Sequence, residues 1–448
     1  MKLRISSLEH LFVVLGFFLL SGAVLPLVRF GGVEGFNALE GDPLLQGVWA
    51  VLYATVFGVV LVRIPAVARV VPGTLMLWAL IVLALASAAW ASYPSASLRR
   101  SAALLGTTLF GLYFGARFTP EQQVRLLGWA YGLIVVSCFV MALAFPAYGI
   151  NHTYHEGAWQ GAFIHKNTHG KAMVVGLMLF LVLAASLPRR RRWVAVAGAV
   201  GSAALIVLSR SVTAMVLSAC LAMVYGLLRA RRRLDSTLVA TAGLVVVVVG
   251  GAAVLSLAVN AEAATTALGR DVTLTGRTVL WAVALQFIGE APLLGHGYAS
   301  FWLGPVGPSG AIWRMVGWEV PHAHNGMLDL ALDLGIVGVA LFAWVFGSTL
   351  MRSYRLFVRH VNPAGAWPLV VVLITTLYNT TENTLLVRNS IYWALFVSAA
   401  CTAYRALQTS RPLPAGAPHG SPRPRRRAGV APARARHTAE PAEAGWRP

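Results

Sequence analysis

Apolar residues occur in long runs along most of the chain, and polar residues separate them. A helix needs about 20 apolar residues to cross the hydrocarbon core of a bilayer. The pattern predicts twelve such spans, at about 9–29, 44–63, 73–92, 101–117, 124–147, 171–188, 193–209, 212–228, 237–259, 327–350, 367–380 and 389–407. The eleventh is the weakest, because Tyr378-Asn379-Thr380-Thr381-Glu382-Asn383 interrupts it. The first resembles a signal peptide, but without a clear cleavage site we expect it to be retained. We therefore expect an all-α integral membrane protein.

The composition supports this prediction. The 448 residues are 57% hydrophobic and only 12% charged, with a mean hydropathy of +0.69. A soluble domain carries about a quarter charged residues. The 36 Lys and Arg against 16 Asp and Glu give a net charge of +20, but the arginines form short clusters between apolar runs, which argues against nucleic-acid binding. Cys138, Cys220 and Cys401 all lie in apolar runs, so no disulfide framework or metal cluster is indicated.

The arginine clusters also predict an orientation. They lie at 189–192, at 229–233 and at 352–359, in alternate connections, and cytoplasmic connections are enriched in Lys and Arg. With Met1 in the cytoplasm, all three clusters are cytoplasmic; Arg99 and Arg100 on the outer side are an exception. We expect a membrane domain over residues 1–407. The Pro-, Ala- and Arg-rich tail, 408–448, cannot form a core and is predicted to be a disordered cytoplasmic segment.

Unusual polar residues gather on the predicted outer side. Two outer connections, 148–170 and 260–326, are too long to be turns, and they hold seven of the eleven histidines: His152, His155, His165, His169, His296, His322 and His324. We therefore expect function on the outside, which is the periplasm if the cell has two membranes.

The segment His322-Ala323-His324-Asn325-Gly326 stands at the entry to the tenth span. A neutral imidazole there is able to accept a proton near pH 7; the alternative is an interfacial histidine making ordinary hydrogen bonds. A metal site is the weakest of the three options, since no Asp, Glu or Cys lies nearby in the sequence.

Four cationic residues on the outer side point to an anionic ligand. Arg210 stands between two apolar runs, Arg277 lies in the long outer loop, and Lys166 and Lys171 flank one outer segment. Guanidinium groups bind phosphate oxygens in a bidentate manner. Arg210 alone has the simpler explanation of a side chain that reaches the lipid headgroups.

Acidic residues offer two further candidate groups. Asp329 and Asp333 are one helical turn apart in the tenth span, where a carboxylate needs partners; an ion path and pairing with an arginine are both open. Glu34, Glu40 and Asp42 in the first outer loop are candidates for a metal-dependent reaction.

Several motifs in a fixed order resemble those of the O-antigen ligase-related superfamily. They are Phe163-Ile164-His165-Lys166-Asn167, Ser209-Arg210-Ser211, Thr275-Gly276-Arg277 with Trp281, Pro292-Leu293-Leu294-Gly295-His296-Gly297-Tyr298, and His324-Asn325-Gly326 followed by Leu334-Gly335-Ile336-Val337-Gly338. The resemblance covers about residues 160–345, with a weaker stretch at 379–389.

This resemblance implies a membrane glycosyltransferase of the GT-C type with a large periplasmic loop in the bacterial inner membrane. Such proteins transfer glycan from an undecaprenyl-diphosphate carrier to a hydroxyl on lipid A core or on a growing glycan, without cofactor or metal. By resemblance, His324 is the catalytic residue, and Arg210, Arg277 and Lys166 bind the donor diphosphate. His165, Asn167, His322 and Asn325 are supporting residues.

Some motifs, among them Thr381-Glu382-Asn383-Thr384, resemble the exopolysaccharide-polymerase branch of the superfamily more than the core-oligosaccharide ligase branch. Ligation and polymerisation both stay open. Two rival functions are a twelve-span secondary transporter, which predicts inverted repeats and broken helices, and a metal-dependent lipid-linked-sugar transferase.

Overall fold

The computed structural model describes residues 2–23, 42–153, 155–230, 236–259, 277–305, 307–317 and 319–409. The chain divides into two units, Met1–Ser410 and Arg411–Pro448. The second unit and nearly all of the predicted tail lie outside the described residues. So do Glu34 and Glu40, and residues 260–276 of the large outer loop.

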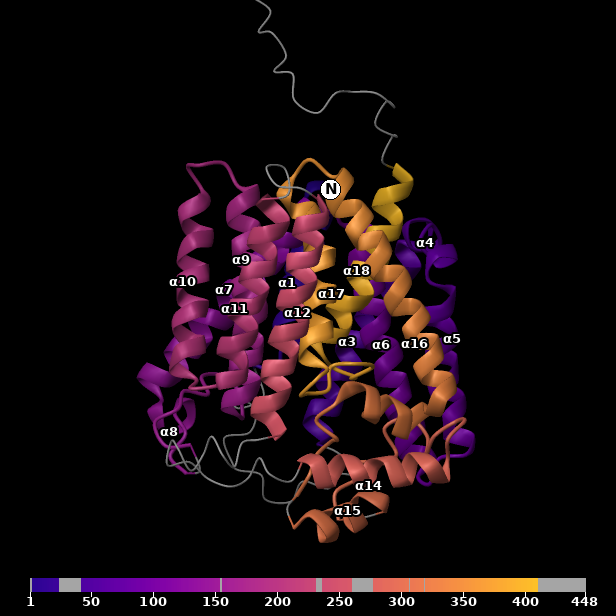
Figure 1. Ribbon diagram of the computed structural model, residues 1–448. Helices are drawn as coiled ribbons and strands as arrows, with labels where there is room; N and C mark the ends of the chain where they lie inside the picture. Colours follow the sequence, from indigo (N-terminus) through magenta and orange to yellow (C-terminus); the bar gives the residue numbers. More distant parts are fainter. Residues whose placement is uncertain are drawn as a thin grey trace, which may run out of the picture. The chain divides into compact units, whose positions relative to one another are not determined.

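The described part of the chain is built from helices, with a single isolated β-bridge between Ile150 and Trp159. This confirms the all-helical prediction (Figure 1). In chain order the helices are α1 (Lys2–Leu20), α3 (Pro43–Val62), α4 (Ile64–Ala68), η1 (Val71–Gly73), α5 (Leu75–Ala86), η2 (Ser87–Ala89), α6 (Pro94–Arg117), α7 (Pro120–Ala144), α8 (Pro146–Gly149), α9 (Lys166–Ser186), α10 (Arg192–Leu208), α11 (Val212–Ala230), α12 (Ser236–Val259), α14 (Arg277–Glu290), α15 (Pro308–Val316), α16 (Gly326–Arg359), η3 (Pro363–Ala366), α17 (Trp367–Tyr378) and α18 (Ile391–Thr409).

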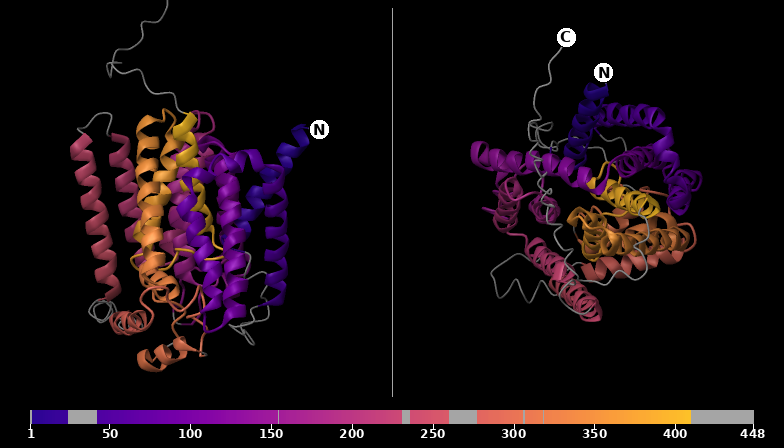
Figure 2. Two further views of the ribbon diagram at one scale, coloured as in Figure 1. Left: turned by 90° about the vertical axis from the view of Figure 1, so that its right-hand side faces the viewer. Right: turned by 90° about the horizontal axis from the view of Figure 1, so that it is seen from above.

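Each of the twelve predicted apolar segments overlaps one of the longer helices. By length and composition five of them, α3, α7, α9, α11 and α16, are able to cross a membrane. A sixth span is formed if Ile64–Gly73 and Leu75–Ala89, which meet at 94°, count as one broken span. The long helices run side by side in all views (Figure 2), so the chain is a multi-pass membrane protein.

Close helix packing explains how α6 and α18 meet. Gly111 and Gly115 are four residues apart on α6, and a Cβ atom at these positions would lie 2.5 Å from the Ala394 carbonyl oxygen and 2.6 Å from that of Ser398. Small residues at this spacing allow two helix backbones to approach closely in a membrane, where packing rather than water exclusion drives association. The second of these helices, α18, follows the connection that carries Glu382 in the site described below.

A helix break at Gly335 is the main irregularity of α16. Gly335 has φ 61° and ψ −163°, a conformation open to glycine because it has no Cβ atom. The loop before it in sequence, 291–297, fills the break. Ile336 N–H donates to the Pro292 carbonyl at 2.9 Å, and Gly297 N–H donates to the Asp333 carbonyl at 3.0 Å. Two of the motifs noted in the sequence are therefore halves of one backbone junction.

This break adds to the interruptions expected from sequence. Only the predicted eleventh span looked interrupted, whereas α16 breaks at Gly335 and the 64–89 segment bends by 94°. Broken helices were a feature expected of the transporter rival. Here the break in α16 is closed by hydrogen bonds to the neighbouring loop, which accounts for it without a transport path.

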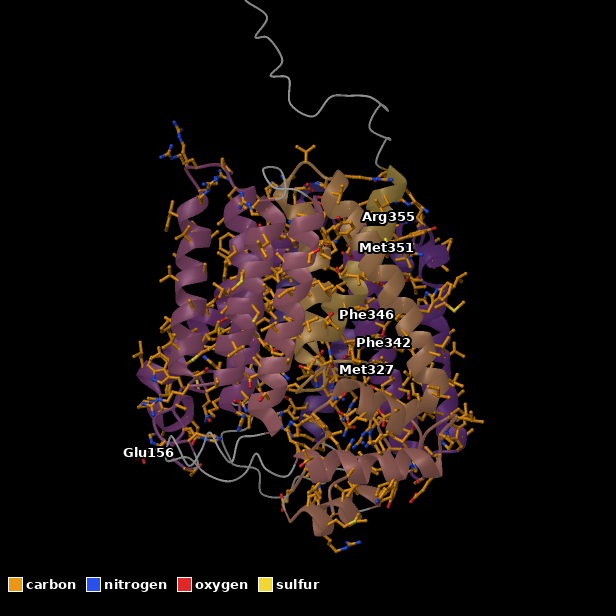
Figure 3. All side chains as sticks on the ribbon, viewed as in Figure 1. Glu156, Met327, Phe342, Phe346, Met351 and Arg355 are labelled. Atoms are coloured by element: carbon orange, nitrogen blue, oxygen red, sulfur yellow. The ribbon has the colours of Figure 1, made fainter. Side chains whose placement is uncertain are left out.

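The two ends of the helices differ in chemistry. Arg355, near the end of α16, lies at the end where the arginine-rich connection between α9 and α10 is found, and Glu156 lies at the opposite end (Figure 3). The 148–170 segment, α14 and α15 are at the Glu156 end (Figure 1). The fold thus separates the two arginine clusters that the structure describes in full, 189–192 and 352–359, from the histidine-rich segments, as the sequence predicts.

Candidate active site

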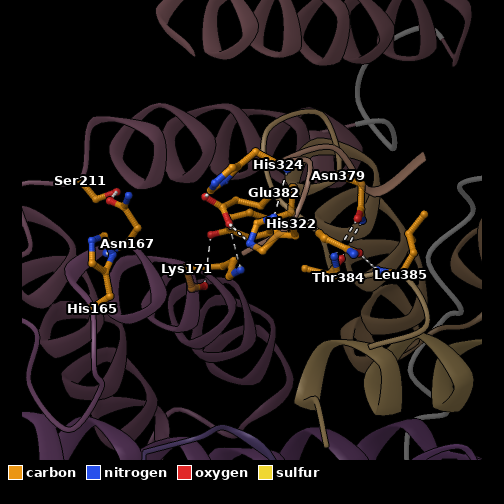
Figure 4. A network of polar contacts seen from close by, with 12 residues as sticks. His165, Asn167, Lys171, Ser211, His322, His324, Asn379, Glu382, Thr384 and Leu385 are labelled. Carbon is orange, nitrogen blue, oxygen red and sulfur yellow. Dashed lines mark hydrogen bonds and ion pairs between the residues drawn. The ribbon is translucent and has the colours of Figure 1, made fainter. Parts of the chain in front are cut away.

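Two histidines and a glutamate from distant parts of the chain meet at the Glu156 end. His322 and His324 precede α16, and Glu382 lies in the connection between α17 and α18. His324 Nδ1 is 3.8 Å from Glu382 Oε1, and His322 Nε2 is 3.9 Å from Glu382 Oε2 (Figure 4). The imidazole rings of the two histidines are 4.2 Å apart. One carboxylate therefore faces both imidazoles.

A lysine from a third element completes this cluster. Lys171, in the second turn of α9, places its Nζ atom 3.6 Å from Glu382 Oε2. Burial alone would raise the pKa of the Glu382 carboxyl, but Lys171, His324 and His322 together outweigh burial and hold that pKa well below its usual range. Glu382 is therefore a carboxylate at any physiological pH.

The connection that carries Glu382 is folded around a single side chain. Asn379 Oδ1 accepts the Thr384 N–H at 2.9 Å, while Asn379 Nδ2 donates to the Thr384 hydroxyl at 2.7 Å. The carbonyl of Asn379 also accepts the N–H of Gly326, at 3.1 Å, at the first residue of α16. The turn that presents Glu382 is thus fastened to the helix that follows the histidines.

His322 is held as a neutral imidazole. Its Nδ1 atom accepts the main-chain N–H of His324 at 3.1 Å, and a nitrogen that accepts a hydrogen bond carries no proton. Desolvation lowers the pKa of His322, the nearby His324 lowers it further, and Glu382 opposes both. The remaining proton is on Nε2, which faces the carboxylate.

The peptide between the two histidines is clamped from both sides. Ala323 N–H donates to Asp329 Oδ1 at 2.9 Å, and the Ala323 carbonyl accepts the indole N–H of Trp281 at 2.8 Å. Asp329 Oδ1 also accepts the indole N–H of Trp302, at 2.8 Å. Asp329 was expected to pair with an arginine or to line an ion path; with a side chain only 2% exposed, it instead orders N–H groups around the site.

The main chain at His324 is strained. Its φ of 51° lies in the left-handed region, which costs a residue with a Cβ atom roughly 1–2 kcal/mol. Such conformations persist where the surroundings enforce them, and they concentrate at functional sites. The clamp on Ala323 and the cap that Asn325 makes to Met327 N–H at 3.0 Å supply that enforcement. Asn325 therefore supports His324 through the backbone.

Arg277 reaches the same cluster from α14. Its side chain is only 8% exposed and makes no hydrogen bond or ion pair with the residues that the structure describes. Burial lowers the pKa of its guanidinium, and Glu382 acts in the opposite direction, which places the two groups within electrostatic reach. A guanidinium is effectively always charged, so a buried one without an acceptor favours an anionic ligand.

The other predicted residues form a neighbouring group. His165 caps α9 by accepting the Asn167 N–H at 3.1 Å, and Lys166 is the first residue of that helix. Ser211 donates to Asn167 Oδ1 at 3.1 Å, which joins this helix start to the turn that carries Arg210. Desolvation has the largest effect on the pKa of His165 and lowers it, while Glu382 acts in the opposite direction.

Arg210 is exposed and is turned toward the 148–170 segment. Its Nη1 atom donates to the Glu156 carbonyl at 2.9 Å, and its φ of 50° is left-handed. No contact joins Arg210 to His324 among the described residues. The predicted residues thus form two adjacent groups, one around Glu382 and one at the start of α9.

Sequence reasoning missed Glu382 and gave Lys171 only a minor part. The signal for Glu382 was present, because a single carboxylate that interrupts an apolar segment needs a partner. The missing information was long-range: Glu382 is 58 positions from His324 in the chain.

The contact between Glu382 and the two histidines also strengthens the case for a metal site. The ligand atoms of His322, His324 and Glu382 lie within 4.8 Å of one another, so the fold supplies the acidic residue that the sequence lacked.

The fold and the site define a multi-pass helical membrane protein with a histidine–carboxylate pair among cationic side chains. Residues 197–343 match the family model described as O-antigen ligase, and the predicted resemblance to the O-antigen ligase-related superfamily is thereby confirmed. The chain is also 26% identical over 266 residues to the exopolysaccharide production protein ExoQ of Rhizobium meliloti (strain 1021). That similarity covers 57% of this chain and 60% of the relative, so the chain spans less than two thirds of that relative.

Proposed function

We propose that this protein transfers glycan from an undecaprenyl-diphosphate carrier to an acceptor hydroxyl, with His324 as the general base. The observation that carries the proposal is the approach of His324 Nδ1 to Glu382 Oε1, at 3.8 Å, beside a buried arginine. The family match supports a ligase- or polymerase-type activity.

In the proposed reaction, the acceptor hydroxyl oxygen forms a bond to the anomeric carbon of the donor sugar. The hydroxyl proton passes to Nε2 of His324, and the bond from the anomeric carbon to the diphosphate oxygen breaks with its electron pair. The imidazolium that forms then presents Nδ1–H to Glu382, which stabilises its charge. The low pKa of Glu382 keeps the carboxylate available for this role.

Cationic side chains would stabilise the leaving diphosphate. Fixed positive groups aimed at developing negative charge act strongly in a site that excludes water. Arg277 is the best placed, since it is buried and near Glu382. Lys166 and Arg210, at the start of α9 and in the turn beside it, would contact the same donor further from His324, so no metal ion is required.

For the topology we propose twelve spans in a GT-C-type arrangement, with both ends of the membrane domain in the cytoplasm of a bacterial inner membrane. The separation of Arg355 from Glu156 along the helices (Figure 3) supports this arrangement. It follows from the positive-inside rule that the His324 site faces the periplasm. The lipid tail of the donor would then lie between helices, with its diphosphate at the bilayer surface.

Of the two reactions, the similarity to an exopolysaccharide production protein favours polymerisation of repeat units over ligation to lipid A core. The deciding experiment is deletion of the gene in its host, followed by separation of undecaprenyl-linked glycans by size. Accumulation of single repeat units indicates a polymerase, and accumulation of full-length lipid-linked polymer indicates a ligase. An unchanged profile contradicts both and favours the transporter.

The metal-dependent alternative has one specific observation in its favour, the grouping of His322, His324 and Glu382. Against it, the Lys171 ammonium lies 3.6 Å from the same carboxylate, so a cation would have to displace an existing positive charge. We expect transfer by purified protein to persist in excess EDTA. Loss of activity in EDTA that returns on adding a divalent cation would replace the base mechanism with a metal-assisted one.

A further inference from the structure

A second unpaired guanidinium lies on the connection that carries Glu382. Arg388 is six positions further along and is half-buried. Within the described ranges its guanidinium makes no hydrogen bond and no ion pair. A half-buried guanidinium without a protein acceptor is available to bind an anion.

The main chain on both sides of Arg388 is fixed by hydrogen bonds. The phenol of Tyr298 donates to the carbonyl of Leu386. On the other side, the N–H of Asn389 donates to the hydroxyl of Thr107 at 2.9 Å, and the phenol of Tyr53 donates to the Asn389 side chain. The anchors come from α3, α6 and the 291–300 loop, so three separate parts of the fold hold this one short segment.

Backbone strain brackets the same residue. Leu386 has φ 49° and Asn389 has φ 55°. Among the described residues, only five other than glycine have a positive φ. Each costs roughly 1–2 kcal/mol for a residue such as leucine, somewhat less for asparagine. Strain of this kind is typical of functional segments. Here it fixes the direction of Arg388 while leaving its guanidinium without a protein partner.

A second arginine adds positive charge beside it. Arg100 is only 7% exposed, its guanidinium donates to the Ala299 carbonyl, and it lies close enough to Arg388 for the two charges to repel each other. Asp333 is within electrostatic reach of both arginines, so two positive groups face one acidic group. The local field therefore favours an added anion.

We propose that Arg388, supported by Arg100, forms a second anion subsite that binds a phosphate group of the acceptor lipid. This inference rests on the proposed function, in which donor and acceptor must be held together. Glu382 and Arg388 lie on one fixed connection, so the subsite would set the distance from the acceptor lipid phosphate to the base. The same phosphate chemistry is found in membrane phospholipid headgroups, and the experiment below separates the two sources.

The test is calorimetric titration of inorganic pyrophosphate into the full chain, purified into phosphatidylcholine nanodiscs. We expect two binding events in the wild type, and one in Arg388→Gln and in Arg277→Gln. Arg314→Gln, which changes an exposed arginine of α15, is the control and should keep both. Should Arg388→Gln fail to fold, Arg388→Lys serves instead, and its second event should weaken by at least about tenfold because lysine lacks the bidentate fork.

Wild-type stoichiometry and affinity in Arg388→Gln would overturn the subsite while leaving the proposed transfer reaction intact. If the protein proves not to transfer glycan, the binding measurement still decides whether the subsite exists. In transfer assays of Arg388→Gln, a KM for the acceptor above that of the wild type, with an unchanged KM for the donor, identifies the acceptor as the source of the phosphate. Loss of the Arg388-dependent event in phosphatidylglycerol nanodiscs identifies the headgroup.

Discussion

Asp329 Oδ1 accepts the main-chain N–H of Ala323 at 2.9 Å, directly between the two histidines of the site. A buried carboxylate in the first turn of α16 therefore sets the position of His324 without contacting its imidazole. Because the Trp281 indole N–H donates to the carbonyl of the same peptide, the proposed base His324 is positioned by a carboxylate and an indole that the sequence gives no reason to connect.

Replacing Asp329 should lower kcat without a comparable change in donor KM. We expect Asp329→Ala to lose about 100-fold in kcat, since displacement of a catalytic group by about 1 Å has an effect of that size. Asp329→Asn keeps an oxygen acceptor for Ala323 and Trp302 and should retain most of the activity. Steady-state kinetics of the two variants make the comparison, and equal losses would contradict a role that depends on the acceptor oxygen.

The Glu382 network should stabilise the protein in a pH-dependent way. The pKa of Glu382 in the folded protein is lowered relative to about 4.3 in an unfolded chain. Its contribution to stability is therefore fully present above pH 4.3 and is lost as the pH falls below that value. Glu382→Gln should lower the Tm by several degrees at pH 7, and the difference from wild type should shrink below pH 4.

Glu290→Gln is the control for that experiment. Glu290 is an exposed residue at the end of α14 and should show no such difference at any pH. A Tm gap for Glu382→Gln that stays constant from pH 7 to pH 3 would mean that the ionised carboxylate is not what stabilises the cluster.

The junction between α16 and the 291–297 loop should tolerate no side chain at Gly335. A Cβ atom there would lie 2.3 Å from the Leu293 carbonyl oxygen, in addition to the cost of positive φ. Gly335→Ala should reduce the Tm strongly or prevent accumulation in the membrane. Gly347→Ala lies on the same helix with nothing within 4 Å of the new atom, and should be neutral or stabilising by up to about 1 kcal/mol. Equal behaviour of the two variants in thermal melts would argue against the junction.

Arg277 should affect donor binding and transfer but not the stability of the fold. We expect Arg277→Gln to weaken binding of the diphosphate and to lower kcat/KM for the donor by about 100-fold or more, the scale on which one preorganised electrostatic group acts. Arg314→Gln should behave as wild type. If Arg277→Gln instead lowers the Tm and leaves donor kinetics intact, this arginine is a structural residue paired with Glu382.

The sequence predicted the helices well because their signal is local. Every predicted apolar segment overlaps a helix, and the 322–326 segment stands at the entry to the tenth span as expected, with Asn325 as the cap of α16. His324 was identified by its motif. The length of α16 across its break, by contrast, follows from hydrogen bonds to Pro292 and Leu293, which no local pattern reports.

The pairing of Glu382 with His324 could not be predicted from the sequence for the same reason. Glu382 meets His324 only because Asn379 folds the α17–α18 connection back onto the start of α16. Asp329 likewise accepts hydrogen bonds from indole and amide N–H groups, where pairing with an arginine and an ion path were the two expectations. Contacts between residues far apart in the chain depend on packing, and a single sequence records the residues but not their neighbours.

The most direct test of the account compares two neighbouring histidines in one assay. Purified protein in proteoliposomes is given an undecaprenyl-diphosphate-linked glycan, and the products are separated by size. His324→Ala should accumulate and melt as the wild type does but lose transfer by at least about 100-fold, the lower end of the effect of a general base. His322→Asn, which keeps an acceptor oxygen for the main-chain N–H of His324, should retain a substantial part of the activity. Normal transfer by a folded His324→Ala protein would contradict the central claim.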